Sequence, residues 1–457
     1  MKKRIWLIVS LMLCCLVFAA LSCSSGNNAT PAVSQDFRGE IRSVSLMQEG
    51  NVEDLYPYLT SLDNDRSASW DSIWEKLRNY FKYSWHLYKV VYYTTDAHGN
   101  KIEVSGALAV PVSIHGHQIE APMLSLQHPT QVERKYSPSA LDILDPELTI
   151  PAALAFCSTG YIVAIPDYPG MGINYDVHPY CQYSLSYSVV DMIRAVEDSK
   201  FYWADNARTT LWNDTLFLMG YSEGGYATMV TAKEIQLNHS DEFTISAVAP
   251  LDGPYSLSET MRNLMVNADA SYSAPYFMPY TIQGYESVYG DDYPEFNFDR
   301  DVKSEVPGYT PPEGSTYALE LEKRLDGTYS GEEISDFMKL ATPYEGPKSI
   351  LTDVFLQEIQ QASGPVYNIL KENNAYNDWT PEMPMKLFHN AHDDLVPVGN
   401  ADEAMAAFDG LSNVTLEKYE AYIPGLGSIH AGSLPIAYYK GFRWIDSYAY
   451  PDRKLPE

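Results

Sequence analysis

The sequence predicts an α/β fold with a mostly parallel central sheet and helices on both faces. Short apolar segments alternate with helical segments along most of the 457-residue chain, and this alternation is typical of parallel sheets that are covered on both sides. In addition, residues 214–226 read as a buried strand, a glycine-rich turn and the start of a helix. With 45% hydrophobic residues, the chain has ample material for a large core.

The first 22 residues have the layout of an export signal. Lys2, Lys3 and Arg4 precede an apolar run over residues 5–20, and Ala20-Leu-Ser-Cys23 has the form of a bacterial lipobox. The run is short for a membrane-spanning helix. We therefore expect a lipoprotein signal peptide at 1–22, lipid attachment at Cys23 and a tether at 23–45. The alternatives are an ordinary signal peptide or a single membrane anchor.

Charge and cysteine content narrow the class of protein. Loss of residues 1–22 removes three basic and no acidic residues, which leaves 28 basic and 60 acidic residues and a net charge of −32. So negative a chain repels nucleic acid and anionic lipid, and we expect no nucleic-acid partner. Beyond residue 23 only Cys157 and Cys181 remain. They could pair in an oxidising compartment, but we favour two buried free thiols, because spacing alone does not bring them within bonding reach.

The predicted elements follow in chain order. Residues 46–86 have helical spacing of large apolar residues and predict an N-terminal helical segment. Residues 88–95 and 102–111 alternate with period two around a turn at 96–100, which indicates a hairpin. The next strand candidates are 122–127, 161–166, 215–219, 245–250, 385–389 and 414–419. The clearest helix between them is 185–201, whose apolar residues fall on one face.

One long gap interrupts the alternation. Residues 250–385 contain no clear core strand, but they contain helical stretches at 257–266, 317–325 and 350–359. An excursion of this length inside a compact domain is usually functional. We interpret residues 254–380 as a helical cap over the site, inserted after the sixth strand, with the core in two parts at 46–253 and 381–457.

Gly220-Tyr-Ser222-Glu-Gly224 has the G-x-S-x-G pattern of a nucleophile elbow. The pentapeptide also occurs by chance in glycine-rich loops, but here a strand precedes it and a helix follows. Glycine removes the side chains that would collide in so tight a turn. Ser222 is therefore the candidate nucleophile.

A serine hydroxyl needs a base and an acid that holds the base. Behind such an elbow the acid and then the histidine follow in the chain. The strand at 385–389 leads into an acidic loop with Asp393 and Asp394, and the strand at 414–419 leads to a glycine-rich loop with His430. These residues complete a candidate Ser-Asp-His triad.

The chain resembles the α/β-hydrolase superfamily, and within it a secretory lipase/esterase-like group with a large cap. The resemblance covers about residues 88–448. It rests on the elbow and on Leu124-Ser-Leu-Gln-His-Pro-Thr130, Val163-Ala-Ile-Pro-Asp-Tyr-Pro-Gly-Met-Gly172, His178-Pro-Tyr180, Asp191-Met-Ile-Arg-Ala195 and His389 to Pro397. It implies the α/β-hydrolase fold, hydrolysis of carboxylic esters through an acyl-enzyme, and, by the D-x-x-V-P spacing, Asp393 rather than Asp394 as the acid.

Besides the two adjacent aspartates of the acidic loop, between which only spacing decides, the chain departs from the family pattern at two positions. His128-Pro129 stands where the family has His-Gly, in the loop that supplies an oxyanion-hole N–H, and proline has none. The donor is then Thr130 or Gln131, of which we select Thr130, and the second donor is the N–H of Glu223. Asp252 follows the strand at 245–250, where some hydrolases carry the acid, and it is the alternative to Asp393.

Other polar clusters favour structural interpretations. His389 and His392 flank the acidic loop without the spacing of a metal site, and Asp291, Asp292, Asp299 and Asp301 lack the register of a calcium loop. His128 is expected to brace the oxyanion loop. The aromatic residues of the cap line a pocket or pack it against the core (Tyr272, Tyr276, Phe277, Tyr280, Tyr285, Tyr289). We expect no metal and no cofactor.

The sequence therefore predicts a serine hydrolase of carboxylesterase or lipase type, acting on a small ester. We place it in a bacterial cell envelope, attached to the membrane through a lipid anchor only. Two alternatives remain. A serine exopeptidase of the same fold would use the acidic cap to bind a peptide amine, although little chain precedes the first strand for a gating domain. The other alternative is a non-catalytic binding protein, which a complete triad disfavours.

Overall fold

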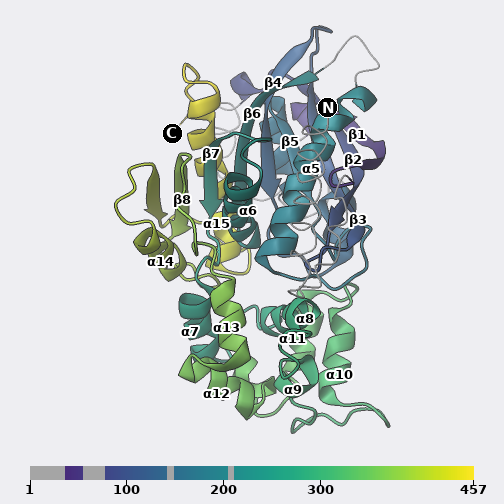
Figure 1. Cartoon of the computed structure of the whole chain (residues 1–457), viewed down its shortest axis with the longest axis vertical. Helices are drawn as coiled ribbons and strands as arrows, with labels where there is room; N and C mark the ends of the chain where they lie inside the picture. The colour runs from purple at the N-terminus through teal and green to yellow at the C-terminus, as the bar shows by residue number, and fades with distance from the viewer. Residues whose placement is uncertain (1–36, 55–77, 141–148, 204–209, 457) are drawn as a thin grey trace, which may run out of the picture. The chain divides into compact units, whose positions relative to one another are not determined.

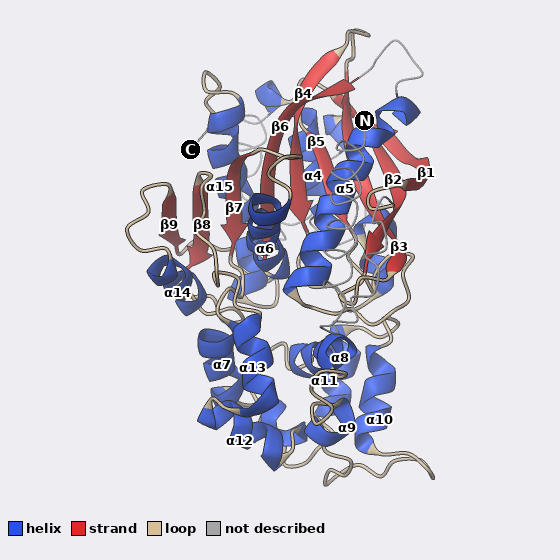
Figure 2. Cartoon of the chain, in the orientation of Figure 1, coloured by secondary structure: helices blue, strands red, loops and turns tan. Residues whose placement is uncertain are grey.

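The computed structural model of the protein describes residues 37–54, 78–140, 149–203 and 210–456. Within these residues, nine strands form one sheet in the order β1-β2-β3-β5-β4-β6-β7-β8-β9. The sheet lies in the upper part of Figures 1 and 2. The strands are β1 (Ile41–Gly50), β2 (Ser84–Thr95), β3 (Lys101–Val112), β4 (Ile119–Gln127), β5 (Ile162–Pro166), β6 (Thr210–Tyr221), β7 (Ile245–Leu251), β8 (Met385–Asn390) and β9 (Val414–Tyr419).

The sheet changes from antiparallel to parallel along its width. β2 and β3 form the predicted hairpin, in continuous antiparallel register, and the Asp96 carboxylate closes the turn by accepting hydrogen bonds from the N–H groups of His98 and Asn100. β3 also pairs antiparallel with β5. All pairs from β5 and β4 through β9 are parallel. The predicted α/β fold with a mostly parallel sheet is confirmed.

The N-terminal part of the core differs from the prediction. The tether was expected to reach residue 45 and to lead into a helical segment, but Ile41–Gly50 forms β1, antiparallel to β2. Without β1, the N–H and C=O groups along one edge of β2 would lack partners. Pairing with β2 therefore determines that Ile41–Gly50 forms a strand. The middle of the expected helical segment, 55–77, lies outside the described residues, as do the signal peptide and Cys23. Because β1 adds a strand, the insertion follows the seventh strand, not the sixth.

Helices cover both faces of the sheet. α5 (Gln182–Trp203), which contains the predicted helix, packs with α6 (Glu223–Asn238) and α14 (Gly399–Ala407) in one hydrophobic cluster, while α4 (Thr149–Ser158) and α15 (Ile429–Ala449) share the other. Alternate residues of β6 point to opposite clusters, with Leu216 and Leu218 on one face and Phe217 and Met219 on the other. Burial on both faces explains why these strands read as continuous apolar runs.

The insertion between β7 and β8 is helical, as predicted. It begins with a π-helical turn (Leu257–Met261) and continues with α7 (Arg262–Asn267), α8 (Phe277–Tyr289), α9 (Phe298–Asp301), α10 (Tyr317–Glu322), α11 (Gly331–Met338), α12 (Asp353–Gln361) and α13 (Gly364–Glu372). These helices lie across the carboxyl ends of the parallel strands (Figure 2). Asn373 ties the insertion to the core, since its Oδ1 accepts from the N–H of Gln182 and its carbonyl accepts from the Tyr226 hydroxyl.

Short 3₁₀ turns connect these elements. They lie at Val52–Asp54, Arg78–Tyr80, Arg134–Tyr136, Pro138–Ala140, Lys323–Leu325 and Pro347–Ile350. None of the helices in the described ranges combines the length and the apolarity that a membrane-spanning segment needs.

We predict that Asp191→Ala destabilises the fold strongly. Its fully buried carboxylate accepts from Arg38 Nε at 2.9 Å, Arg194 Nη1 at 2.6 Å and Thr94 Oγ1 at 2.6 Å. Loss of one partner of a buried ion pair leaves uncompensated charge and costs about 3–5 kcal/mol. Urea unfolding should show this loss, whereas Glu103→Ala, which breaks the exposed pair with Arg42, should leave the midpoint nearly unchanged. Equal midpoints for the two variants would contradict the prediction.

Candidate active site

Ser222 lies in a strained turn between β6 and α6. Its backbone has φ 59° and ψ −122°, and its N–H donates to the Leu251 carbonyl oxygen at 2.9 Å. The flanking glycines are needed for space. A Cβ at Gly224 would lie 2.1 Å from the Gln127 carbonyl oxygen, and one at Gly220 would lie 2.4 Å from the Gly224 carbonyl oxygen. The strand–turn–helix geometry predicted for a nucleophile elbow is therefore present.

Three predicted residues meet at this turn. Ser222 Oγ lies 2.9 Å from Nε2 of His430, and Nδ1 of the same ring lies 2.5 Å from Oδ2 of Asp393. All three side chains are buried. Asp393 comes from the loop after β8 and His430 from the first turn of α15, so the three residues reach the site from separate parts of the sheet edge.

In the His430–Asp393 contact, burial and the neighbouring charge have opposite effects on each pKa. Burial alone would raise the pKa of Asp393, but the adjacent His430 holds it below its ordinary value. Burial alone would lower the pKa of His430, but the Asp393 carboxylate raises it above its ordinary value. The acid therefore stays ionised and stabilises positive charge on the imidazole, the arrangement that a general base requires.

The two neighbouring aspartates have different partners. Oδ1 of Asp393 accepts from the N–H groups of Leu395 and Val396, which orients Oδ2 toward His430. Asp394 instead accepts from the N–H groups of Ile429 and His430, at the amino end of α15. Its carboxylate thus satisfies free N–H groups at a helix start.

In the part of the chain that the structure describes, no hydrogen bond joins Asp252, the alternative acid, to His430. Its Oδ1 accepts from the N–H of Asn390 at 2.7 Å and its Oδ2 from the Tyr419 hydroxyl at 2.6 Å. Burial, together with the nearby Asp393 carboxylate, raises the pKa of Asp252 to about 6.

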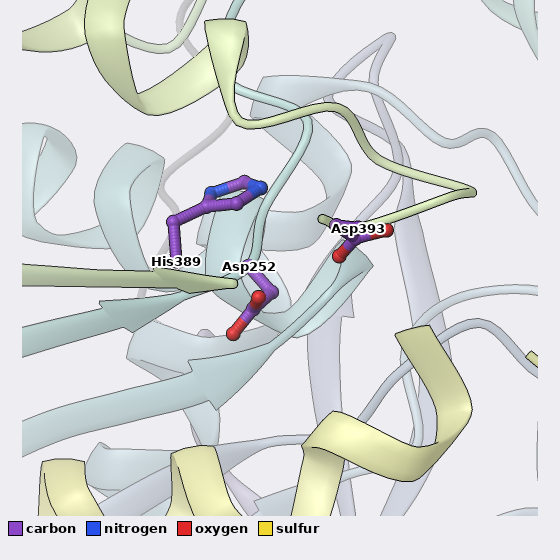
Figure 3. Close-up of side chains that lie close together, drawn as sticks. All are labelled: Asp252, His389 and Asp393. Atoms are coloured by element: carbon purple, nitrogen blue, oxygen red, sulfur yellow. The ribbon is translucent and has the colours of Figure 1, made fainter. Parts of the chain in front are cut away.

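Asp252, His389 and Asp393 form a buried cluster (Figure 3), in which atoms able to bind a metal lie within 4.8 Å of one another. Spacing in the sequence does not reveal this cluster, because Asp252 follows β7 and lies far along the chain from His389 and Asp393. His389 Nε2 lies 2.8 Å from the Val396 carbonyl oxygen, and every carboxylate oxygen of the cluster already accepts a hydrogen bond from the protein. These contacts favour a structural role. His392, with 63% of its side chain exposed, is not part of the cluster.

The loop after β4 lies against the elbow, as an oxyanion loop would. Thr130 lines the same pocket as Ser222, and Glu223 is the first residue of α6. The ring of His128 stacks on Tyr168 with centroids 4.2 Å apart, and the Tyr168 hydroxyl donates to the His128 carbonyl. These contacts pack His128 against the loop that follows β5. The Gln131 carbonyl accepts from the Tyr280 hydroxyl of α8 at 3.1 Å.

An apolar pocket opens at Ser222 and extends under the cap. It is lined by Thr130, Tyr180, Ser222, Pro254, Leu257, Met261, Leu264, Met265, Ala268, Tyr272, Phe277, Met278, Thr281, Leu370, Leu395 and Val396. Of the aromatic cap residues singled out in the sequence, Tyr272 and Phe277 line it, whereas the other four do not. The free space is about 60 Å³, far below the roughly 300–1,000 Å³ of pockets that hold drug-sized ligands.

Sequence reasoning missed two groups beside the site. The Tyr221 hydroxyl donates to the His430 carbonyl at 2.6 Å, and Nε2 of His178 lies 2.5 Å from Oε1 of Glu223. A tyrosine before the serine and a histidine in a distant loop carry no local signal of these contacts. Cys157 and Cys181 are buried free thiols.

Comparison with known proteins agrees with this fold. The family model described as secretory lipase matches residues 144–256, which include the elbow. A candidate hydrolase from Legionella pneumophila superposes with a TM-score of 0.72 at 24% identity, over 90% of this chain and 99% of the other. The ligand-bound rice cell wall degrading esterase LipA from Xanthomonas oryzae has a TM-score of 0.68 at 23% identity, over 91% and 100%.

A more distant structure is that of Candida antarctica lipase A in its closed state, with a TM-score of 0.53 at 14% identity, over 84% of this chain and 77% of the other. No protein among the curated sequences matches the chain. The family match and the fold confirm the resemblance to the secretory lipase/esterase-like group of α/β-hydrolases. They support a hydrolase of lipase or esterase type, and the secretory family indicates an exported protein.

We predict that Asp252 makes stability depend on pH. Its pKa of about 6 in the folded protein exceeds the ordinary value of 3.8, so the folded state holds this proton more tightly and loses stability as pH rises through about 6. Asp252→Asn removes the effect. Relative to wild type, its free energy of unfolding should increase by about 1–1.5 kcal/mol between pH 5 and pH 8 in urea titrations. A difference that is the same at both pH values would show that Asp252 titrates normally.

Proposed function

We propose that the protein is a serine carboxylic-ester hydrolase with Ser222 as nucleophile, His430 as general base and Asp393 as the acid that holds the base. The observation that carries the proposal is the continuous contact from Ser222 Oγ to His430 Nε2 and from His430 Nδ1 to Asp393 Oδ2. The position of Ser222 at a strained elbow supports its assignment as nucleophile. The turn presents the Ser222 hydroxyl at the start of α6, where the helix dipole favours negative charge.

The reaction then follows from the positions of these groups. His430 Nε2 takes the hydroxyl proton as Ser222 attacks the ester carbonyl, and Asp393 stabilises the imidazolium. The N–H groups of Glu223 and Thr130 are the proposed donors to the oxyanion. The imidazolium passes its proton to the departing alcohol, which leaves an acyl group on Ser222. Water, activated by the same histidine, releases the acid and restores the serine.

The pocket at Ser222 supports an ester with a short acyl chain. Its lining is almost entirely apolar and is supplied mainly by the cap, which suits a hydrocarbon chain and excludes water from the acyl-enzyme. None of the described lining residues is acidic, so the pocket offers no counter-charge for the amine of a peptide. This composition favours the esterase over the exopeptidase, and the connected triad favours catalysis over simple binding.

We predict that the triad variants lose activity with the fold intact. Ser222→Ala and His430→Ala should lower kcat for p-nitrophenyl butyrate by a factor on the order of 10⁴. Asp393→Asn should be severe, because it replaces the charge that stabilises the imidazolium. Asp394→Asn should be mild, because Asp394 bonds the start of α15 and not the His430 ring, and the remaining amide oxygen can still accept from one of the two N–H groups there. A greater loss with Asp394→Asn would reverse the assignment of the acid.

We predict that Met278→Ala shifts chain-length preference toward longer esters. Met278, Met265, Thr281 and Leu370 line both the pocket at Ser222 and an adjoining apolar cavity within the cap. Removing the Met278 side chain joins these spaces. In a p-nitrophenyl series from acetate to decanoate, the best substrate should lengthen by several carbons. Met338→Ala, at a buried cap methionine outside both linings, is the matched control. A shift of the same size in the control would place chain-length selection elsewhere.

We further propose that a lipid on Cys23 anchors the protein in a bacterial cell envelope. The support is the sequence of residues 1–23, which lies outside the described part of the chain. Cys23→Ala should release the protein from the membrane fraction or leave the signal uncleaved. Mass spectrometry should find a mature chain that begins with a modified residue 23. An unmodified mature terminus at another residue would exclude the anchor.

A further inference from the structure

A buried ion pair lies on the residue that follows the proposed nucleophile. The side chain of Glu223 is 1% exposed, and its Oε1 lies 2.5 Å from Nε2 of His178. His178 belongs to the loop between β5 and α5, and its Nδ1 lies 2.8 Å from the Pro169 carbonyl oxygen. Because both ring nitrogens face acceptors, both carry a proton, and the ring is a cation. The pair therefore consists of two buried opposite charges.

The cap touches the same pair. Tyr280 of α8 stacks on His178, with centroids 5.6 Å apart and an interplanar angle of 17°, and its hydroxyl donates to the carbonyl of Gln131, next to Thr130. The His178 backbone also presses on α8, since a Cβ at Gly284 would lie 2.6 Å from the His178 carbonyl oxygen. The contacts of His178 thus reach both segments that carry the proposed oxyanion donors.

We propose that His178 and Glu223 are a positioning pair that sets the oxyanion hole. The ion pair holds the first turn of α6, and with it the N–H of Glu223. Through Tyr280 it also holds the segment that contains Thr130. The inference rests on the proposed ester hydrolysis. Neither His178 nor Glu223 lines the pocket at Ser222, so the pair acts through the backbone rather than on the substrate.

The His178–Glu223 pair also makes the positioning of the oxyanion donors depend on pH. Burial alone would lower the pKa of His178, but Glu223 raises it above its ordinary value. The other titratable groups that face the ring are Tyr168, Tyr180 and Tyr280, and burial raises the pKa of each hydroxyl well above its usual range. They remain neutral, which leaves Glu223 as the counter-charge. As pH rises through the pKa of His178, the ring loses its proton and the ion pair is lost.

The test compares wild type with His178→Gln, Glu223→Gln and the double variant on p-nitrophenyl acetate. Each single variant should lower kcat about 10- to 100-fold, somewhat less than removal of an oxyanion donor, and change KM by less than about threefold. The double variant should recover part of kcat, since two amides can hydrogen-bond to each other. Affinity for a boronic acid that mimics the tetrahedral intermediate should fall in step with kcat/KM. The alkaline decline of the wild-type kcat should disappear in His178→Gln.

The matched control is His239→Gln, which removes a similar contact at the other end of α6, where His239 Nε2 lies 3.1 Å from Glu234 Oε1. It should leave kcat unchanged. The proposal is overturned if folded His178→Gln or Glu223→Gln keeps wild-type kcat and boronic acid affinity, or if activity falls only in proportion to the folded fraction. If His178→Gln does not fold, the kcat and boronic acid affinity of Glu223→Gln alone test the proposal.

An inactive wild type would contradict the proposed function and not the positioning pair. The positioning role of the pair is then tested by the rate at which a fluorophosphonate labels Ser222, because phosphonylation also places negative charge in the oxyanion hole. Labelling that is slower in Glu223→Gln than in wild type and His239→Gln supports the pair, and equal rates refute it.

Discussion

Ser222 has a backbone φ of 59° and ψ of −122°, a conformation that costs a residue with a side chain about 1–3 kcal/mol. The surrounding structure holds it there. Its N–H is bonded to Leu251 at the end of β7, and Gly220 and Gly224 allow β6, α6 and the end of β4 to approach within contact. This one turn sets the position of the proposed nucleophile, the start of α6 and the loop after β4 at the same time. The other parts of the site are arranged around it.

Buried charge is the second organising feature. His430 lies against Asp393, and His178 lies against Glu223, so two imidazole–carboxylate contacts flank the same serine. They differ in what the second ring nitrogen faces. In His430 it faces a hydroxyl that can exchange a proton, whereas in His178 it faces a backbone carbonyl that cannot. The first contact therefore suits proton transfer, and the second suits a fixed charge.

The cap is part of the core rather than an appendage. Buried residues of α8 to α13 belong to the same hydrophobic cluster as α5 and α6, and Tyr280 joins the cap to the loop after β4. The walls of the pocket come mainly from the cap, whereas Ser222 comes from the turn after β6. In the proposed mechanism, the selection of the substrate is therefore separate from the chemistry. Insertions at this edge can then alter selection without disturbing the elbow.

The sequence by itself determined the elements whose signals are local. Buried apolar strands, the hairpin around residues 96–100 and the elbow at Ser222 depend on residues close together in the chain, and they formed as predicted. The order in which Asp393 and His430 follow Ser222 is likewise a feature of the sequence, and the fold brings both side chains to the elbow. β1 was missed, because its polar residues resemble a linker until the free edge of β2 is available to pair with it.

Only the tertiary structure shows the partners of residues that lie far apart in the chain. Spacing in the sequence favours Asp393 over Asp394, but it does not show that Asp393 contacts His430, that Asp252 contacts Asn390 and Tyr419, or that Asp394 contacts the start of α15. The same holds for His178, whose partner Glu223 is distant in the chain. Hydrogen bonds and desolvation act over a few ångströms in space, so residues far apart along the chain acquire their roles only when the fold brings them together.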